Sequence, residues 1–358
     1  MTDPIQGGAS DRGLARLTVD LGALRENYRR IADVGGCTAA VVKADAYGLG
    51  AVRVVEALCR EGCRDFFVAT EAEGIAVRAA TRDSNIFVFS GPLDARSAAA
   101  MVRHALTPVL NDRNQLDLWR EHMETPVAVH VDTGMHRLGF DRRDLSAAMF
   151  EGFNVALVLS HLACADDPAH PMNRQQADRF EAVRSLFPNA LGSLANSAGA
   201  LGGIGSDMAR AGIALYGGNP FSTRPNPMLP VATLEALVVA LRTVPKGQPI
   251  GYGGTYTTAQ ATRIAVLGAG YADGIPRGLS PDARVALRGN RLPVVGRVSM
   301  DLLHVDASDV ESEIALGDWV EVFGRTVGID ETAAWAGTIS YELLTRLGGR
   351  VQRFYTGQ

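Results

Sequence analysis

The chain has no long hydrophobic run and no large excess of charge of either sign. No apolar stretch approaches the roughly 18 residues needed to cross a bilayer. The formal net charge is −4, and no basic run is interleaved with aromatic residues, which argues against a nucleic-acid surface. Met1–Gly13 lacks the basic and apolar regions of a secretory signal. We therefore expect residues 1–13 to be a disordered tail and the protein to be cytoplasmic, with no nucleic-acid or membrane partner.

Cysteine is scarce, and the usual nucleotide-binding glycine motif is missing. Of the four cysteines, Cys59 and Cys63 have a spacing compatible with one helix face, but no second Cys or His pair completes a zinc site. We expect reduced core cysteines and no metal. The glycine-rich run at 251–254 lies among β-type segments, so it predicts a hairpin turn rather than a phosphate loop.

What the chain does contain is a regular alternation of β-branched apolar runs with segments of helical period, between Cys37 and about Tyr216. This alternation is typical of repeated βα units and a parallel sheet. The eight candidate strands are Thr38–Val42, Asp65–Ala69, Asn85–Phe89, Leu106–Leu110, Val127–Val131, Val155–Ser160, Leu191–Ala195 and Ala209–Leu215. Eight such strands close a (β/α)8 barrel. Candidate helices between them are Ala51–Glu61, Glu71–Ala80, Leu93–Arg103 and Arg174–Leu186.

The pattern changes near Leu234, where short β-type runs separated by Gly, Pro and Asp predict an antiparallel domain. A chain of 358 residues is long for one hydrophobic core and fits two domains. We therefore predict an α/β fold, with an N-terminal (β/α)8 TIM barrel over residues 14–234 and a mostly antiparallel β domain over 235–358. The segment Ala15–Val19 also has strand character, and its length would let it pair with the second domain.

Reactive residue types gather at the carboxyl ends of the predicted barrel strands, where barrel enzymes carry their chemistry. They are Lys43, Asp132, Arg137, His161, Asn196, Ser197, Arg210, Gly212 and Ile213. Lys43 ends an apolar run, where burial of the charged amine is costly unless it is compensated or neutral. A neutral amine is the nucleophile that forms a covalent imine, while a solvent-exposed lysine at a strand end is the simpler interpretation.

Seven sequence blocks resemble the motifs of bacterial alanine racemases, which are fold-type-III enzymes dependent on pyridoxal 5'-phosphate (PLP). The blocks occur in the family's order and span nearly all of the chain beyond Leu14. The first four are Val41–Gly48, Asp132–Gly139, the pair Ser160-His161 with Asn196-Ser197, and Arg210–Gly217. The other three are Gly270–Gly274, Gly296–Asp301 and Ile339–Glu342.

The resemblance implies an isomerase that interconverts L-alanine and D-alanine and supplies D-alanine for peptidoglycan. Lys43 would hold PLP and serve one enantiomer as the base, and Tyr271 would serve the other from the opposite face. His161 would hydrogen-bond Tyr271, and Arg210 would hold His161 and face the pyridine nitrogen. Because a guanidinium does not readily give up a proton, that nitrogen would stay largely unprotonated.

The resemblance also assigns the remaining contacts. The cofactor phosphate would meet Ser197, Tyr47, Tyr341 and the backbone of Gly212 and Ile213, and Asn196 joins the cofactor-binding residues. The substrate carboxylate would meet Arg137 and the Met300 N–H, with Asp301 beside them. In the family, Tyr271, Met300 and Asp301 come from the partner subunit, which implies a homodimer with shared active sites.

One position departs from the family pattern. Many relatives carry a lysine, modified to a carbamate, two residues before the Asp-Thr-Gly motif, where this chain has His130. We expect Arg137 to be oriented by something else, such as a chloride ion or a neighbouring acceptor. His136 is also unusual, and we assign it no role.

Three alternative functions stay open. A PLP-dependent decarboxylase of basic amino acids would typically pair an acidic residue with the pyridine nitrogen. A cofactor carrier built from a barrel alone would need neither a second domain nor Tyr271. A racemase of serine, lysine or broad specificity would use the same mechanism on a different side chain.

Overall fold

The computed structural model describes residues 13–279, 282–310 and 313–357. They divide into two compact units, one made of residues 21–229 with Gly357 and the other of residues 13–20 and 230–356. The predicted tail, residues 1–13, lies outside the described residues except for Gly13. No described helix has both the length and the apolar character needed for a membrane span.

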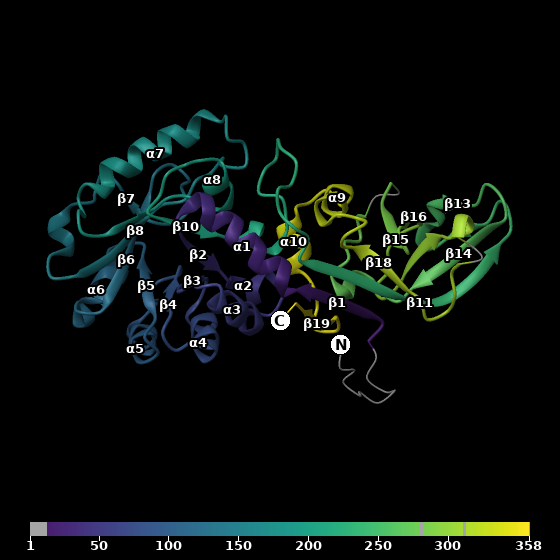
Figure 1. Cartoon of the computed structure of the whole chain (residues 1–358), viewed down its shortest axis with the longest axis horizontal. Helices are drawn as coiled ribbons and strands as arrows, with labels where there is room; N and C mark the ends of the chain where they lie inside the picture. The colour runs from purple at the N-terminus through teal and green to yellow at the C-terminus, as the bar shows by residue number, and fades with distance from the viewer. Residues whose placement is uncertain (1–12, 280–281, 311–312, 358) are drawn as a thin grey trace. The chain divides into compact units, whose positions relative to one another are not determined.

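The first unit is built on eight parallel strands (Figure 1). In spatial order they are β10 (Met208–Ala211), β2 (Cys37–Val41), β3 (Asp65–Val68), β4 (Asn85–Val88), β5 (Thr107–Leu110), β6 (Pro126–Asp132), β8 (Asn154–Leu159) and β9 (Leu191–Ser193). The short β7 (Phe140–Asp141) pairs with β6 outside this path. A parallel bridge between Asn196 and Arg210 links the two ends of the path. The predicted eight-stranded, barrel-like parallel sheet is confirmed.

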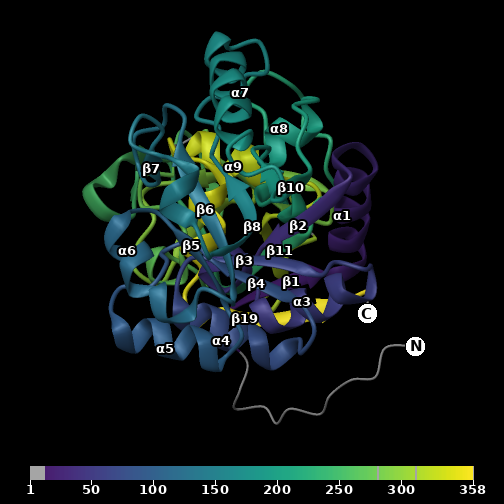
Figure 2. The same cartoon turned by 90° about the vertical axis from the view of Figure 1, so that its left-hand side faces the viewer.

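Helices cover the outside of these strands, as Figure 2 shows for α3 to α6. They are α1 (Leu21–Gly35), α3 (Ala51–Arg60), α4 (Glu71–Ala80), α5 (Ala95–Arg103), α6 (Arg113–Leu118), α7 (Pro171–Arg184) and α8 (Ser197–Leu201), with 3-10 turns η1 (Arg120–His122) and η2 (Ala147–Phe150). In α3, Val54, Val55 and Leu58 face the core at helical spacing. Side-chain oxygens of Thr70 and Asp94 accept backbone N–H groups and so start α4 and α5.

The last predicted barrel strand is wrong in its second half. The sequence predicts a strand over Ala209–Leu215, but β10 ends at Ala211 and Ile213–Tyr216 forms the 3-10 turn η3. All four residues of η3 are buried. In a short run where every residue is apolar, the sequence has no periodicity, so it cannot distinguish a buried strand from a buried turn.

The second unit is mostly antiparallel. Its main sheet runs in the order β14 (Thr262–Leu267), β17 (Leu303–Asp306), β16 (Asn290–Val295), β15 (Arg284–Leu287), β18 (Trp319–Phe323), β11 (Ala232–Val244), β1 (Ala15–Asp20) and β19 (Gln352–Thr356). β1 pairs antiparallel with β11 and parallel with β19. Alternate residues of β1 are buried, as expected for a strand with one face on the core.

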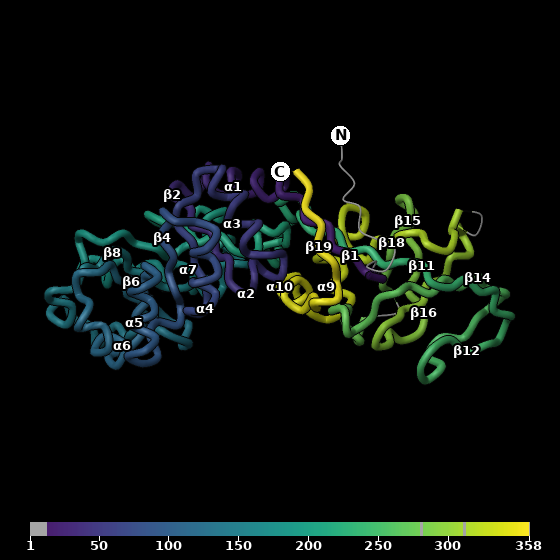
Figure 3. Tube along the Cα trace, turned by 90° about the horizontal axis from the view of Figure 1, so that it is seen from below, coloured from purple at the N-terminus to yellow at the C-terminus, as the bar shows by residue number. Residues whose placement is uncertain are grey.

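Shorter elements complete this unit. β12 (Pro249–Ile250) and β13 (Tyr256–Thr257) pair antiparallel around η4 (Tyr252–Gly254), which confirms the predicted hairpin. The helices are α9 (Ile329–Trp335) and α10 (Ser340–Thr345), and the other 3-10 turns are η5 (Tyr271–Asp273) and η6 (Ser308–Val310). The trace in Figure 3 follows the chain from α9 through α10 into β19.

Candidate active site

Lys43 lies two residues after the end of strand β2 at Val41 and begins an unusual turn, α2 (Lys43–Tyr47). Ala44, Asp45, Ala46 and Tyr47 all have positive φ, between 52° and 57°. A left-handed residue other than glycine costs roughly 1–2 kcal/mol, so the surrounding structure must hold this turn in place. The Ala44 N–H donates to Glu73 Oε1 at 2.8 Å, and Asp45 Oδ1 accepts the Ala51 N–H at 2.7 Å.

The left-handed turn delivers the Tyr47 side chain into a buried cluster. Its ring stacks on Tyr216 with 4.6 Å between centroids, and the Tyr216 hydroxyl donates to the Val41 carbonyl at 2.7 Å. The Gly212 N–H donates to Ser197 Oγ at 2.8 Å. A Cβ built on Gly212 would lie 2.6 Å from Tyr47 Oη, so only glycine fits there. Two hydroxyls and a backbone N–H therefore meet at one point.

The amine of Lys43 lies in a partly buried, electropositive setting. Its Nζ is 5.7 Å from the centroid of the Phe89 ring. Burial and then the charge of Arg137 lower the pKa of Lys43, with a smaller contribution from Arg210, while Glu73 opposes the shift. A lowered pKa increases the fraction of neutral amine, which is the nucleophilic form.

Arg210 lies 2 % exposed at the end of β10. Nη1 donates to the Ser193 carbonyl and to Ser193 Oγ at 2.7 and 2.6 Å, and Nη2 donates to the Ser160 carbonyl at 2.5 Å. Nη2 also lies 3.3 Å from His161 Nδ1. Burial lowers the pKa of Arg210 to about 10, so the guanidinium remains charged at neutral pH. Among the described residues, no carboxylate pairs with this buried cation.

The contact with Arg210 determines which tautomer His161 adopts. Arginine has donors only, so His161 Nδ1 must accept and Nε2 carries the proton. Burial holds the pKa of His161 well below its usual value, and the charges of Arg210, Arg137 and Lys43 add to that shift. His161 is therefore a neutral imidazole that offers one N–H donor.

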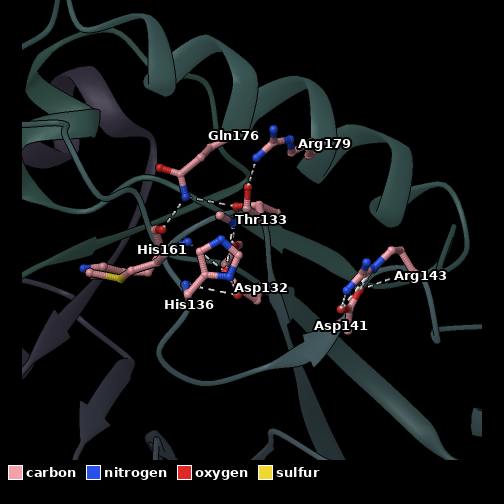
Figure 4. Close-up of polar contacts among 11 residues, drawn as sticks. Asp132, Thr133, His136, Asp141, Arg143, His161, Gln176 and Arg179 are labelled. Carbon is pink, nitrogen blue, oxygen red and sulfur yellow. Dashed lines mark hydrogen bonds and ion pairs between the residues drawn. The ribbon is translucent and has the colours of Figure 1, made fainter.

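The loop after β6 carries Arg137 and is shaped by Asp132. Asp132 Oδ1 accepts the backbone N–H groups of Gly134, Met135 and His136 at 2.8–3.1 Å. Burial alone would raise the pKa of Asp132, but these donors outweigh it and hold the pKa below its usual value. Figure 4 shows this carboxylate beneath the exposed ring of His136.

His130 lies inside the barrel, 8 % exposed. Asn111 Nδ2 donates to the carbonyls of Phe89 and Val109, so Asn111 Oδ1 is left to accept from His130 Nδ1 at 2.8 Å. Burial, and then the charges of Arg210 and Arg137, lower the pKa of His130 to about 4. At neutral pH, His130 is an uncharged ring whose Nε2 carries a lone pair.

The remaining predicted site residues belong to the second unit. The Tyr271 N–H donates to the Ser299 carbonyl at 3.0 Å, and the Ala272 N–H donates to the Met300 carbonyl at the same distance. The turn that carries Tyr271 is thus joined to the loop that carries Met300 and Asp301. Tyr341 lies in the first turn of α10. Nine of the predicted site residues lie in the first unit, namely Lys43, Tyr47, Arg137, His161, Asn196, Ser197, Arg210, Gly212 and Ile213. Four lie in the second unit, namely Tyr271, Met300, Asp301 and Tyr341.

Family models match both halves of the chain. The model described as alanine racemase, N-terminal domain, matches residues 19–220, and the one described as alanine racemase, C-terminal domain, matches residues 231–355. Alanine racemase of Rhodospirillum rubrum is 43% identical over 98% of this chain and 98% of that protein. The chain belongs to the alanine racemase family. The catabolic alanine racemase of Agrobacterium fabrum is also 43% identical, over 98% of this chain and 93% of its own length.

A solved structure of the family supports both the fold and the cofactor. Alanine racemase from Bartonella henselae, with covalently bound pyridoxal phosphate, matches with a TM-score of 0.90 and 35% identity over 96% of this chain and 100% of that one. PLP fits the residues of the first unit. Ser197 Oγ, Tyr47 Oη and the Gly212 N–H are groups of the kind that can bind a phosphate, and a Cβ at position 212 would crowd them.

Two residues that hydrogen-bond the predicted site residues or their neighbours were not predicted. Gln176, fully buried on α7, donates to Thr133 Oγ1 at 3.1 Å and to the His161 carbonyl at 2.9 Å, and accepts the Ala163 N–H (Figure 4). Glu73 accepts from Ala44 and from Ala69, at 2.8 and 2.7 Å. The Thr-x-x-Glu spacing before α4 is a capping-box signal that could have identified Glu73.

Proposed function

We propose that this chain interconverts L-alanine and D-alanine with PLP held by Lys43. Membership of the alanine racemase family supports the reaction. The observation that carries it within the site is the buried Arg210, which contacts a neutral His161 and has no carboxylate partner among the described residues. A decarboxylase of this fold class would typically place an acidic residue where the racemase places this arginine.

Each residue has a role that follows from its chemistry. When bound, PLP supplies the electron sink that makes the α-proton of the amino acid removable. Lys43, whose pKa is lowered, takes the α-proton from one enantiomer of alanine or returns it on that face. Tyr271 does the same for the other enantiomer on the opposite face.

Tyrosine is a weak base unless its phenolate is stabilised. His161 is the group that we assign to this task. Because Arg210 fixes the acceptor at Nδ1, the Nε2–H of His161 is the donor that stabilises the Tyr271 oxygen. The Arg210 cation keeps its proton and therefore leaves the pyridine nitrogen of the cofactor largely unprotonated.

The remaining predicted residues are assigned to binding the cofactor and the substrate. We assign the cofactor phosphate to Tyr47, Ser197, Tyr341 and the backbone of Gly212 and Ile213, and place Asn196, the N-cap of α8, beside them. Arg137 offers two parallel donors to the substrate carboxylate, which also meets the Met300 N–H near Asp301. Tyr271, Met300 and Asp301 would come from the partner subunit of a homodimer.

Chiral analysis of products tests the reaction. Purified protein with PLP is incubated separately with L-alanine, L-serine and L-lysine, and the D-enantiomers are quantified over time. We expect rapid formation of D-alanine and little turnover of the other two. Faster racemisation of serine or lysine would reassign the substrate, and no racemisation of any of the three would overturn the proposal.

The Lys43→Ala variant tests the covalent attachment. We expect it to lose the visible absorbance of the bound cofactor together with racemisation, because no amine remains to attach PLP. A variant that keeps both would remove Lys43 from its assigned role. Lys246→Ala, at a lysine outside the barrel unit, is the control.

A further inference from the structure

Three segments of the second unit meet around the turn that carries Tyr271. They are the Gly270–Gly274 turn, the Ser299–Asp301 loop, and the stretch from Arg346 to Arg350 that follows α10. A Cβ on Gly270 would lie 2.4 Å from the Met300 carbonyl oxygen, so the turn and the loop pack backbone against backbone. Their two hydrogen bonds, from Tyr271 and Ala272, lie in this contact.

The third segment packs against the same turn. The Gly348 N–H lies 3.3 Å from the Asp273 carbonyl oxygen, and a Cβ on Gly348 would lie 2.8 Å from the carbonyl oxygen of Ala272. A Cβ on Gly274 would meet the carbonyl oxygen of Arg346 at 2.7 Å. The close approach of three backbones makes the position of the Tyr271 turn sensitive to any displacement of its neighbours.

Arg350 links the turn to the loop through two carboxylates. Its Nε and Nη2 donate to the two oxygens of Asp273 at 3.1 and 2.9 Å, and its Nη1 donates to Asp301 Oδ1 at 2.8 Å. Asp273 is 5 % exposed, and its Oδ2 also accepts the Gly270 N–H at 2.9 Å. The two carboxylates raise the pKa of Arg350, mainly through its hydrogen bond to Asp273, so the bridge stays charged. A planar guanidinium can bind one carboxylate with two donors and reach a second one, which an ammonium cannot do.

Stability accounts for only part of this bridge. Asp273 is buried and loses its paired cation if Arg350 is replaced, which costs stability, whereas the ion pair between Arg350 and Asp301 is exposed on both sides and adds little to the folding free energy. The bridge also fixes the relative position of two segments. It connects the turn that carries Tyr271, the residue assigned to proton transfer, with the loop that carries Met300 and Asp301, the residues assigned to the substrate carboxylate.

We propose that Arg350 is a positioning residue that holds the Tyr271 turn in register with the Met300–Asp301 loop for proton transfer by Tyr271. The inference rests on the proposed function, because it uses the role assigned to Tyr271. Arg350 touches neither substrate nor cofactor in this scheme and acts through Asp273 and Asp301.

The test compares Arg350→Met with Arg350→Lys and with a matched control, Arg346→Met. Arg346 is also 54% exposed and also forms a hydrogen-bonded ion pair, but its carboxylate partner is Glu342 on α10. Because misplacing a reacting group by about 1 Å can cost roughly a hundredfold, we expect kcat with L-alanine to fall ten- to a hundredfold in Arg350→Met, less in Arg350→Lys, and under twofold in Arg346→Met.

Isotope effects measured with alanine deuterated at the α-carbon distinguish a loss of positioning at Tyr271 from a general loss of activity. In Arg350→Met, we expect the primary isotope effect to rise with only one of the two α-deuterated enantiomers, the one whose proton Tyr271 abstracts, because that abstraction becomes slower. The isotope effect with the other α-deuterated enantiomer should not rise, since Lys43 performs that step. PLP absorbance should match that of Arg346→Met, and the melting temperature of Arg350→Met should be the lower of the two because the buried Asp273 loses its cation.

Two results would overturn the inference. One is an Arg350→Met enzyme with the rate of the Arg346→Met control. The other is a rise in both isotope effects together, which would indicate a structural role without selectivity for the Tyr271 step. Failure of the wild-type enzyme to racemise alanine would instead reject the proposed function.

Discussion

His130 stands where many alanine racemases carry a modified lysine, and its environment explains which form it takes. Its Nδ1 hydrogen-bonds Asn111, and Gln115 in turn accepts from the Asn111 amide and donates to the Ser90 carbonyl. These contacts fix the neutral tautomer. His130 therefore supplies Arg137 with no negative charge, and whatever acceptor orients that guanidinium must lie elsewhere or be the bare Nε2 of this ring.

The buried neutral form of His130 predicts a pH dependence of stability. The pKa falls from 6.5 in the unfolded chain to about 4 in the folded protein. Between these values the unfolded chain binds a proton that the native state does not, so the free energy of unfolding decreases as pH falls below 6.5. The difference between these two pKa values makes this group's loss of stability about 2 kcal/mol between pH 7 and pH 5.

Urea denaturation at pH 7 and pH 5 measures this loss. Wild type should lose about 2 kcal/mol more than His130→Gln, which has no proton to gain. His136→Gln, at an exposed histidine, is the control and should behave like wild type. Equal losses in wild type and His130→Gln would show that the ring is already protonated or solvated in the native protein.

At the scale of the element, helix α7 connects two parts of the barrel mouth that lie far apart in sequence. Gln176 hydrogen-bonds Thr133, which precedes Arg137, and the backbone of His161. Arg179, one turn further along, donates to the Thr133 carbonyl at 2.9 Å (Figure 4). The helix therefore fixes the distance between the loop for the substrate carboxylate and the histidine assigned to Tyr271.

The Gln176→Met variant keeps the approximate length of the side chain but removes the hydrogen bonds that connect the Thr133 loop with His161. It leaves the His161 carbonyl and the Ala163 N–H without their partner, at a cost of about 2–4 kcal/mol in stability. We expect KM for alanine to rise and kcat/KM to fall roughly tenfold or more, since the Arg137 loop loses its anchor.

The neighbouring Gln175 supplies the control for this prediction. Gln175 is exposed on the same helix, so Gln175→Met makes the same chemical change away from the site and should leave both parameters and the melting temperature unchanged. Steady-state kinetics and thermal unfolding check both variants. A Gln176→Met enzyme with wild-type kinetic constants would exclude this anchoring role.

Elements whose residues alternate or repeat with a clear period were predictable, and those held by distant contacts were not. The helix over Glu71–Ala80 has the bounds that its sequence pattern predicts, and the strand predicted over Asp65–Ala69 ends one residue earlier, at Val68. The left-handed turn at Ala44–Tyr47 has no local signal, because Ala and Tyr disfavour positive φ and only tertiary contacts impose it.

The same limit applies to the site. Lys43 and His161 follow predicted strands and Arg210 lies in one, and parallel strands bring their carboxyl ends to one rim. Gln176 lies in a polar helical segment, where glutamine ordinarily faces solvent. Arg350 lies 77 residues from Asp273 and 49 from Asp301 along the chain, so no spacing rule connects them.

At the scale of the whole molecule, the two residues to which we assign proton transfer belong to different units. Lys43 lies in the unit of residues 21–229 and Tyr271 in the unit that contains residues 230–356. If each active site combines Lys43 of one chain with Tyr271 of its partner, the two residues can be mutated in separate chains and recombined in a mixed dimer.

The experiment mixes Lys43→Ala with Tyr271→Phe, each inactive alone, under conditions that exchange subunits. A mixed dimer then contains one site with both native residues and one site with neither. Random pairing at equal amounts makes half of the dimers mixed, so about a quarter of the wild-type activity per chain should return.

The control mixes Lys43→Ala with the double variant that carries both substitutions, which can form no native site and should stay inactive. Native mass spectrometry of the two mixtures verifies that mixed dimers form. If both residues of a site came from one chain, every site in the mixed dimer would carry one substitution and no activity would return. Recovered activity therefore requires that the lysine of one subunit and the tyrosine of the other act on the same substrate.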